Sequence, residues 1–323
     1  MKRSSASPNP PAQRRIGSVV TKESFGSNAD IWDLLVRTGN IPEKPVCRRC
    51  RNNLNTNEAR KKLHFSIRCT KCMQSTYLLE KHDLFEVKNI RKFLFCLTKW
   101  LSNAKFSSIK SSTAITKRTW RNYKRICHNV LDAVLKRMKE GGKMKLGGPG
   151  RVVEVDECHL FTRKYGRGKP LANESLWVVG LIERDNLPGR KATFLLTKKR
   201  SGKVLVPFIN KWVEKGSILI SDEWKGYTKE LDGSFVRKTV NHSKEYGHRE
   251  MVDGVEIPVN TNHIEREWRE LRKVLEYHKE DQFPGLIQKE IFRIMFLAGR
   301  PEEEWPFIFL EQMGKVRNNQ VLF

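Results

Sequence analysis

The sequence predicts an α/β fold in which a mixed sheet is flanked by helices and preceded by two smaller modules. Beyond residue 150, short apolar runs and amphipathic stretches follow in the order of three strands, a helix, a strand and further helices. This order matches the ribonuclease-H-like layout. A segment with five Gly and one Pro in ten residues separates this region from the rest. The strands are expected at residues 152–156, 176–182, 192–197, 217–221 and 235–240, and the helices at 204–213, 264–277 and 286–297.

The charge of the chain points to an anionic partner. Its 323 residues include 62 Lys and Arg against 36 Asp and Glu, a formal net charge of +26. The simplest partner for such an excess is the phosphate backbone of nucleic acid. Hydrophobic residues make up 38% of the chain, which excludes an acidic disordered protein. No apolar run approaches the roughly 20 residues that span a bilayer, so we expect a soluble intracellular protein with no membrane partner.

Composition divides the chain into six segments. The first is polar, and its basic pairs Lys2-Arg3 and Arg14-Arg15 resemble a split nuclear-import signal. We therefore expect a nuclear protein if the host is eukaryotic, and one of the cytoplasm or nucleoid otherwise. The expected segments are a disordered basic tail (1–25), a zinc ribbon (40–80), a helix-turn-helix DNA-binding unit (86–140), a Gly-rich linker (141–150), the catalytic sheet domain (151–300) and a C-terminal tail that packs on that domain (301–323).

The ribbon is predicted from four cysteines. Cys47 and Cys50 form one Cys-x-x-Cys pair, Cys69 and Cys72 form another, and 18 residues separate the pairs. Two such pairs can place four thiolates tetrahedrally around one zinc ion. His64 is a conceivable ligand, but four cysteines already complete the site, which leaves the zinc a structural role. The alternatives are free buried thiols or a redox pair.

The helix-turn-helix is predicted from two amphipathic helical patterns on either side of a short polar segment, residues 107–113. Thr116 can cap the second helix. Basic residues crowd the start of this helix, which suits a recognition helix in the major groove of double-stranded DNA. The alternative is a solvated face on a very basic protein. The candidate DNA-binding residues are Lys117, Arg118, Arg121, Asn122, Lys124 and Arg125.

Three carboxylates are candidates for a catalytic metal site. Asp156 ends the first strand, Asp222 ends the fourth, and Glu265 lies near the start of a helix. The first and fourth strands are neighbours in a ribonuclease-H-like sheet, so their ends can bring the two aspartates together. Because adjacent strand residues point to opposite faces, only one acid of each pair, Asp156 or Glu157 and Asp222 or Glu223, is expected to face the site.

Converging carboxylates repel one another unless divalent cations lie between them. Hard oxygen ligands select Mg²⁺ or Mn²⁺, and two such ions support phosphodiester chemistry. One ion lowers the pKa of the attacking water or 3′-hydroxyl, and the other stabilises the leaving oxyanion. For each acid alone, the ordinary interpretation is a surface residue.

Several short motifs follow one another within residues 40–300. They are Val155-Asp156-Glu157, Arg163-Lys164-Tyr165, Arg167-Gly168, Trp177-Val178-Val179-Gly180, Ile220-Ser221-Asp222, Trp224-Lys225-Gly226-Tyr227, Val240-Asn241-His242-Ser243 and Asn260-Thr261-Asn262-His263-Ile264-Glu265 with Trp268. In this order they resemble the Merlin superfamily of cut-and-paste DNA transposases. The chain departs from that pattern at Arg266, where a small residue is expected, and over residues 246–258.

The resemblance implies a DDE triad of Asp156, Asp222 and Glu265 on a ribonuclease-H-like fold, with an N-terminal zinc ribbon and DNA-binding helices. It implies an enzyme that cuts DNA at terminal inverted repeats and joins the freed 3′ ends to target DNA. Cutting and joining two ends needs more than one active site, so we expect at least a homodimer on DNA.

Further residues near the acids have two interpretations each. His242 either contacts the scissile phosphate or is a structural histidine. The basic loop after the first acid either clamps DNA or is a solvated hairpin. Trp268 either stacks on a base or packs around the site. Asn262 is a possible accessory residue beside Glu265. The loop residues are Arg163, Lys164, Arg167 and Lys169.

Two other functions fit the same residues. One is a nuclease or junction resolvase on the same fold, which would not join the cut ends. The other is a domesticated, catalytically inactive transposase retained as a zinc-dependent DNA-binding protein. The presence of all three acids argues mildly against the second.

Overall fold

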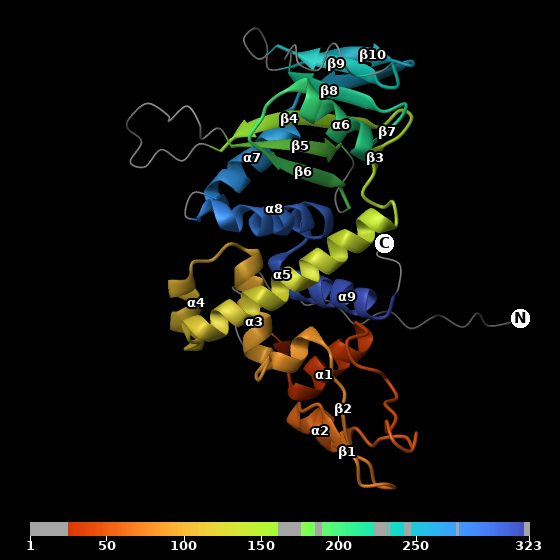
Figure 1. Cartoon of the computed structure of the whole chain (residues 1–323), viewed down its shortest axis with the longest axis vertical. Coiled ribbons are helices and arrows are strands. Elements are labelled where there is room, and N and C mark those ends of the chain that lie inside the picture. The colour runs from red at the N-terminus through yellow and green to blue at the C-terminus, as the bar shows by residue number, and fades with distance from the viewer. Residues whose placement is uncertain are drawn as a thin grey trace, which may run out of the picture.

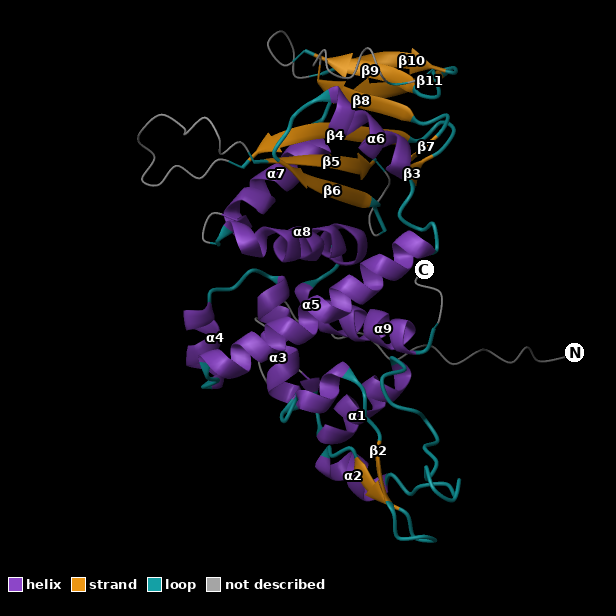
Figure 2. Cartoon of the chain, viewed as in Figure 1, coloured by secondary structure: helices purple, strands orange, loops and turns teal. Residues whose placement is uncertain are grey.

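The computed structural model describes residues 25–160, 176–184, 189–222, 231, 233–241, 247–275 and 278–319. These residues form three tiers along the long axis of the molecule (Figure 1). A sheet with its helices occupies one end, a layer of helices the middle, and the small cysteine-bearing ribbon the other end (Figure 2). Among all the residues that the structure describes, no helix is long and apolar enough to cross a membrane.

The central sheet has five strands in the order β6-β5-β4-β8-β9. Strand β4 pairs antiparallel with β5 and parallel with β8, β5 pairs antiparallel with β6, and β8 pairs parallel with β9. This mixed sheet flanked by helices confirms the predicted ribonuclease-H-like fold class. The strands are β4 (Val152–His159), β5 (Trp177–Glu183), β6 (Ala192–Thr197), β8 (Ile218–Asp222) and β9 (Val236–Val240).

Helices cover both faces of the sheet. Successive side chains of β4 point to opposite faces, so each face of this strand packs against different helices. Val153 and Val155 pack with Leu205 and Ile209 of α6 (Gly202–Trp212) on one face. The other face is covered by α7 (Asn262–Leu275) and α8 (Phe283–Phe292), which continues as a π-helical turn (Arg293–Leu297). Burial of apolar side chains on both faces stabilises the sheet and fixes α7 beside the strand that carries Asp156.

A hairpin that the sequence analysis did not predict lies beside β9. Strands β10 (His248–Val252) and β11 (Val255–Val259) pair antiparallel within the stretch that departs from the family pattern. Asp253 and Gly254 both have positive φ, and Asp-Gly is the favoured pair for such a two-residue turn. This turn was the sequence signal for the hairpin.

In the middle tier, the helices around the predicted helix-turn-helix have bounds different from those expected. Residues 107–113, expected as a polar connection, belong to helix α4 (Phe106–Thr113). The turn is therefore residues 114–116, with Ala114 in the left-handed region, between α4 and α5 (Lys117–Glu140). The Thr116 hydroxyl caps α5 by accepting from the Thr119 N–H at 3.1 Å. Helix α3 (Ile90–Leu101) packs against both α4 and α5.

The linker and the C-terminal tail also differ from expectation. Part of the glycine-rich linker is packed, because β3 (Leu146–Gly147) pairs with β7 (Val213–Glu214). Helix α9 (Trp305–Arg317) contacts the π-helical turn, but it packs chiefly against α3 and α5 and against residues 38–40. The remaining elements are α1 (Asn28–Arg37), α2 (Asn57–Lys62), β1 (Ser66–Arg68), β2 (Ser75–Tyr77) and the short 3₁₀ turns Asp83–Glu86, Glu280–Gln282 and Glu302–Glu304.

Candidate active site

Three carboxylates converge where β4 and β8 lie side by side. The two strands are parallel and in register up to Val155 and Ser221, so Asp156 and Asp222 follow as neighbours. Carboxylate oxygens of Asp156, Glu157 and Asp222 all lie within 4.8 Å of one another. The structure therefore brings the two predicted aspartates together and adds Glu157 to them.

The expectation that only one of Asp156 and Glu157 reaches the site was wrong. Pairing of β4 with β8 ends at Val155, so no β8 residue flanks Glu157 and its longer side chain can turn toward the aspartates. Arg200 holds it there: its Nη2 donates to Glu157 Oε2 at 2.8 Å and lies 3.7 Å from Asp222 Oδ2. Arg200 itself stacks over the Trp177 ring, so the cluster already contains one fixed cation.

Two acids of this cluster, Asp156 and Glu157, hold their protons unusually strongly. Burial, reinforced by the charges of Asp222 and Glu265, raises the pKa of Asp156 to about 6, although a hydrogen bond from Trp268 opposes the rise. Burial also raises the pKa of Glu157 to about 7, against the opposing charge of Arg200. Clustered oxygen donors whose ionised forms are disfavoured fit Mg²⁺ or Mn²⁺, because a bound cation restores the ionised state.

Glu265 lies in the first turn of α7, at the border of this cluster. It is exposed, and its Oε1 accepts a hydrogen bond of 2.8 Å from the Thr261 hydroxyl. Its charge is close enough to raise the Asp156 pKa, although its oxygens are not among those within 4.8 Å of one another. Asn262 is the first residue of α7, and its N–H donates to Asn260 Oδ1 at 3.3 Å. Arg266 faces Glu267 at 4.0 Å.

Trp268 packs around the site and holds one of its acids. Its indole Nε1 donates to Asp156 Oδ2 at 2.7 Å, and its ring packs against that of Phe194. Gly180 lies directly opposite Asp156 on β5 and makes room for the indole. A Cβ at this glycine would stand 2.5 Å from the indole Cη2. The packing interpretation of Trp268 is therefore the one that this geometry supports.

Sequence reasoning missed two charged residues of this region, Arg200 and Glu154. Glu154 lies on β4 two residues before Asp156, and its side chain is fully buried. Burial would raise its pKa, but the hydrogen bond from His263, the charge of Arg184 and the Ile264 N–H lower the pKa instead. A charged residue inside the apolar run 152–155 was the signal for it. Arg200 carries no local signal, because it reaches the acids from beyond β6.

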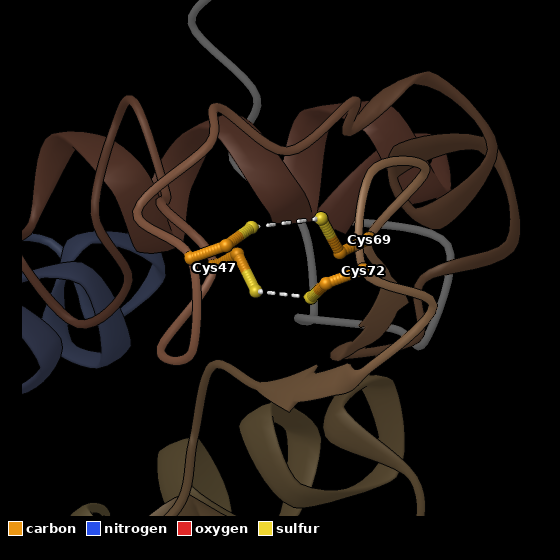
Figure 3. A group of neighbouring side chains, drawn as sticks. Cys47, Cys69 and Cys72 are labelled. Carbon is orange, nitrogen blue, oxygen red and sulfur yellow. Dashed lines mark hydrogen bonds between the residues drawn. The ribbon is translucent and has the colours of Figure 1, made fainter.

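The four predicted zinc ligands come together in the ribbon. Figure 3 labels three of them, Cys47, Cys69 and Cys72. The sulfurs of Cys47 and Cys72 are 3.5 Å apart, and those of Cys50 and Cys69 are 3.6 Å apart. Backbone N–H groups within each Cys-x-x-Cys turn lower the pKa of Cys47 to about 6 and also lower that of Cys69. This four-cysteine cluster is compatible with one zinc ion. His64 is not part of it.

The basic face of α5 is only partly open to solvent. Lys117, Arg118 and Arg121 are exposed. Lys124 is half-buried against the Trp120 ring, and burial lowers its pKa. Arg125 pairs with Glu86 and with Asn122. Other predicted residues lie outside the part of the chain that the structure describes: Arg163, Lys164, Arg167, Lys169, Glu223, His242 and the basic pairs of the tail.

Residues 145–282 match the family model of the ISXO2-like transposase domain. The matched stretch begins in the linker and contains the acid cluster and Glu265, whereas the ribbon and α5 precede it. The match supports a DNA transposase of the DDE type and the divalent metal ions that such enzymes use. Comparison with curated proteins gave no match, and comparison with solved structures gave none either.

Proposed function

We propose that this chain is a cut-and-paste DNA transposase of the Merlin superfamily. It binds terminal inverted repeats, hydrolyses the phosphodiester at the element end and joins the 3′-hydroxyl to target DNA. The observation that carries this proposal is the convergence of Asp156 and Asp222 at adjoining strand ends, inside the segment that matches a transposase domain. Glu265 of α7 completes the triad.

The triad residues Asp156, Asp222 and Glu265 are those that would hold two Mg²⁺ or Mn²⁺ ions. When bound, such ions activate the attacking water or 3′-hydroxyl and stabilise the leaving oxyanion. Trp268 orients the Asp156 carboxylate through its 2.7 Å hydrogen bond. Arg200 brings a positive charge to Glu157 and Asp222. This charge lessens the repulsion between the acids and an approaching DNA phosphate.

The N-terminal modules bind the transposon ends. One structural zinc ion in the four-cysteine cluster folds the ribbon, since a unit this small has little core of its own. The exposed cations Lys117, Arg118 and Arg121 begin the helix that follows the turn, the place of a recognition helix. Two ends are cut and joined, so the active form is a homodimer or a larger assembly on DNA. It acts in the nucleus of a eukaryotic host, or in the cytoplasm or nucleoid otherwise.

Strand cleavage and strand transfer test this function. The substrate is the element's own end sequence with Mg²⁺ or Mn²⁺, and wild type is compared with Asp156→Ala, Asp222→Ala and Glu265→Ala. Asp253→Asn, in the exposed β10–β11 turn, is the control, because Asn tolerates the positive φ of this position. Metal-dependent cutting and joining that all three variants lose, with DNA binding intact, is the expected result. Cutting without joining indicates a nuclease, and binding without cutting indicates an inactive DNA-binding protein; either result refutes the transposase.

A further inference from the structure

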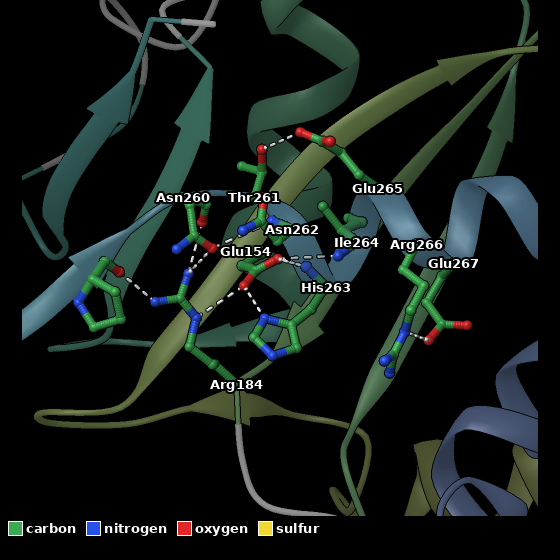
Figure 4. Close-up of polar contacts among 11 residues, drawn as sticks. Glu154, Arg184, Asn260, Thr261, Asn262, His263, Ile264, Glu265, Arg266 and Glu267 are labelled. Carbon is green, nitrogen blue, oxygen red and sulfur yellow. Dashed lines mark hydrogen bonds and ion pairs between the residues drawn. The ribbon is translucent and has the colours of Figure 1, made fainter. Parts of the chain in front are cut away.

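A buried carboxylate joins the strand of Asp156 to the helix of Glu265 (Figure 4). Glu154 Oε2 accepts from the backbone N–H groups of His263 and Ile264, each at 3.0 Å. Its Oε1 accepts from His263 Nδ1 at 2.7 Å and from Arg184 Nε at 2.8 Å. The helix residues involved are 109 and 110 positions away along the chain.

Glu154 caps α7 from a neighbouring strand. The first N–H groups of a helix have no partner inside it, and an N-cap side chain usually accepts from one of them. In α7 the Thr261 hydroxyl donates to Glu265. The carboxylate from β4 accepts from the backbone instead, and its negative charge is favourable at a helix N-terminus. The first turn of α7 is thereby fastened to the strand, and Glu265 is the next residue after Ile264.

Arg184 extends the same network to the segment that enters α7. Its guanidinium donates to the Asn260 carbonyl at 2.6 Å and to the Pro258 carbonyl, and its side chain is largely buried. The positive charge balances that of Glu154, which a buried carboxylate requires. The ion pair of Glu154 and Arg184 thus holds together β4, the end of β11 and the start of α7.

We propose that Glu154, supported by Arg184 and His263, is a positioning residue that sets Glu265 against Asp156 and Asp222 for metal binding. This inference rests on the proposed function. A purely structural ion pair could lie anywhere in the core. This one fixes the only part of α7 that carries a triad acid, and it does so from the strand of another triad acid. Loss of the network leaves the two aspartates in place but frees the third acid.

The test compares Glu154→Gln with Glu183→Gln, a matched control. Glu183 is also a buried carboxylate of the central sheet, paired with Arg151 and with the Gly147 N–H, but it does not contact α7 through these bonds. Two readouts are used on the full-length, zinc-loaded chain: amide hydrogen exchange of residues 262–266, and Mn²⁺ affinity from the electron paramagnetic resonance signal of free Mn²⁺.

We expect faster exchange over residues 262–266 and about tenfold weaker Mn²⁺ binding for Glu154→Gln, the usual scale for residues that orient metal ligands. Glu183→Gln shows neither change when the two variants are compared at equal global stability. The double variant Glu154→Gln/Glu265→Gln binds Mn²⁺ no more weakly than Glu265→Gln, because both act through one ligand. Unchanged exchange and affinity in Glu154→Gln, or losses that simply add, would overturn the proposal.

His263 provides a second test that survives if Glu154→Gln fails to fold. His263→Ala removes one donor and leaves both backbone N–H groups in place, so it is milder. His263→Asn restores a donor near the position of Nδ1 and should recover wild-type exchange and Mn²⁺ affinity. If both variants behave alike, the positioning role is refuted. If the wild type binds Mn²⁺ but cuts no DNA, only the transposase function is refuted. If it binds no Mn²⁺, the metal site and the positioning role are both refuted. Hydrogen exchange then shows only whether Glu154 holds α7 against β4.

Discussion

Replacing Asp156 with Asn should stabilise the metal-free protein at neutral pH. Asn has the same shape and keeps an oxygen that can accept from the Trp268 indole. It removes a buried negative charge that lies beside Asp222 and Glu265. Burial and these charges raise the pKa of Asp156 from 3.8 to about 6 in the folded chain. One unit of pKa corresponds to about 1.4 kcal/mol, so the ionised form disfavours folding by about 3 kcal/mol.

The sign of the effect fixes its pH dependence. Between pH 4 and 6 the folded chain binds more protons at Asp156 than the unfolded chain does, so wild-type stability falls as pH rises through this window. Above this pH window the ionised Asp156 lowers wild-type stability by the full amount, about 3 kcal/mol. The advantage of Asp156→Asn should therefore be near zero at pH 4 and about 3 kcal/mol at pH 8.

Urea unfolding followed by tryptophan fluorescence measures this difference in buffers without Mg²⁺ or Mn²⁺, with zinc retained in the ribbon. Asp253→Asn, in the exposed hairpin turn, is the control and should follow wild type at every pH. Mn²⁺ at 100 times its Kd should stabilise wild type by about 2.7 kcal/mol and the variant by much less. If Asp156→Asn gains nothing at pH 8, the acid is not held in a disfavoured ionised state and the reasoning fails.

Three further predictions concern other parts of the molecule. Gly180→Ala forces a Cβ into the Trp268 indole that holds Asp156. Urea unfolding should show a loss of about 1–3 kcal/mol in the free energy of unfolding, and DNA cleavage should fall. Gly233→Ala, whose Cβ meets open space, should change neither. Cys69→Ser should remove the single zinc ion measured by mass spectrometry and weaken DNA binding, while far-ultraviolet circular dichroism retains the helices and sheet; unchanged zinc content would contradict the four-cysteine site. Arg121→Ala should weaken DNA binding and lower the slope of log K against log salt by about one, whereas Lys136→Ala, further along the same helix, should have little effect; equal losses would argue against a recognition helix.

Local sequence patterns predict most of the strands and helices of the central sheet domain. Periodicity located all five strands of the central sheet, and α6 and α7, within three residues at each end. It did so most readily for β5 and β8, whose residues are mostly buried and form nearly continuous apolar runs. The polar segment 107–113 misled, because serine-rich stretches favour turns in isolation whereas Ile109 and Thr113 bury one face of α4. The Asp253-Gly254 pair, with positive φ at both residues, is the local sequence signal of the β10–β11 hairpin.

The candidate site divides in the same way. The identity and order of Asp156, Asp222 and the four cysteines could be predicted, because strand ends and Cys-x-x-Cys turns are local features. The entry of Glu157 into the cluster depended on where pairing with β8 stops, which no alternation rule contains. Arg200 was out of reach for the same reason, since it bonds to a residue 43 positions away.

By itself the sequence determined the fold class, the cysteine quartet and the two strand-end aspartates, since these follow from the chemistry of nearby residues. Only the tertiary structure decided how α7 is held against β4, because Glu154 and His263 meet across 109 residues of chain. Such contacts depend on strand register and helix placement together. They join β4 to the first turn of α7, which also carries Glu265.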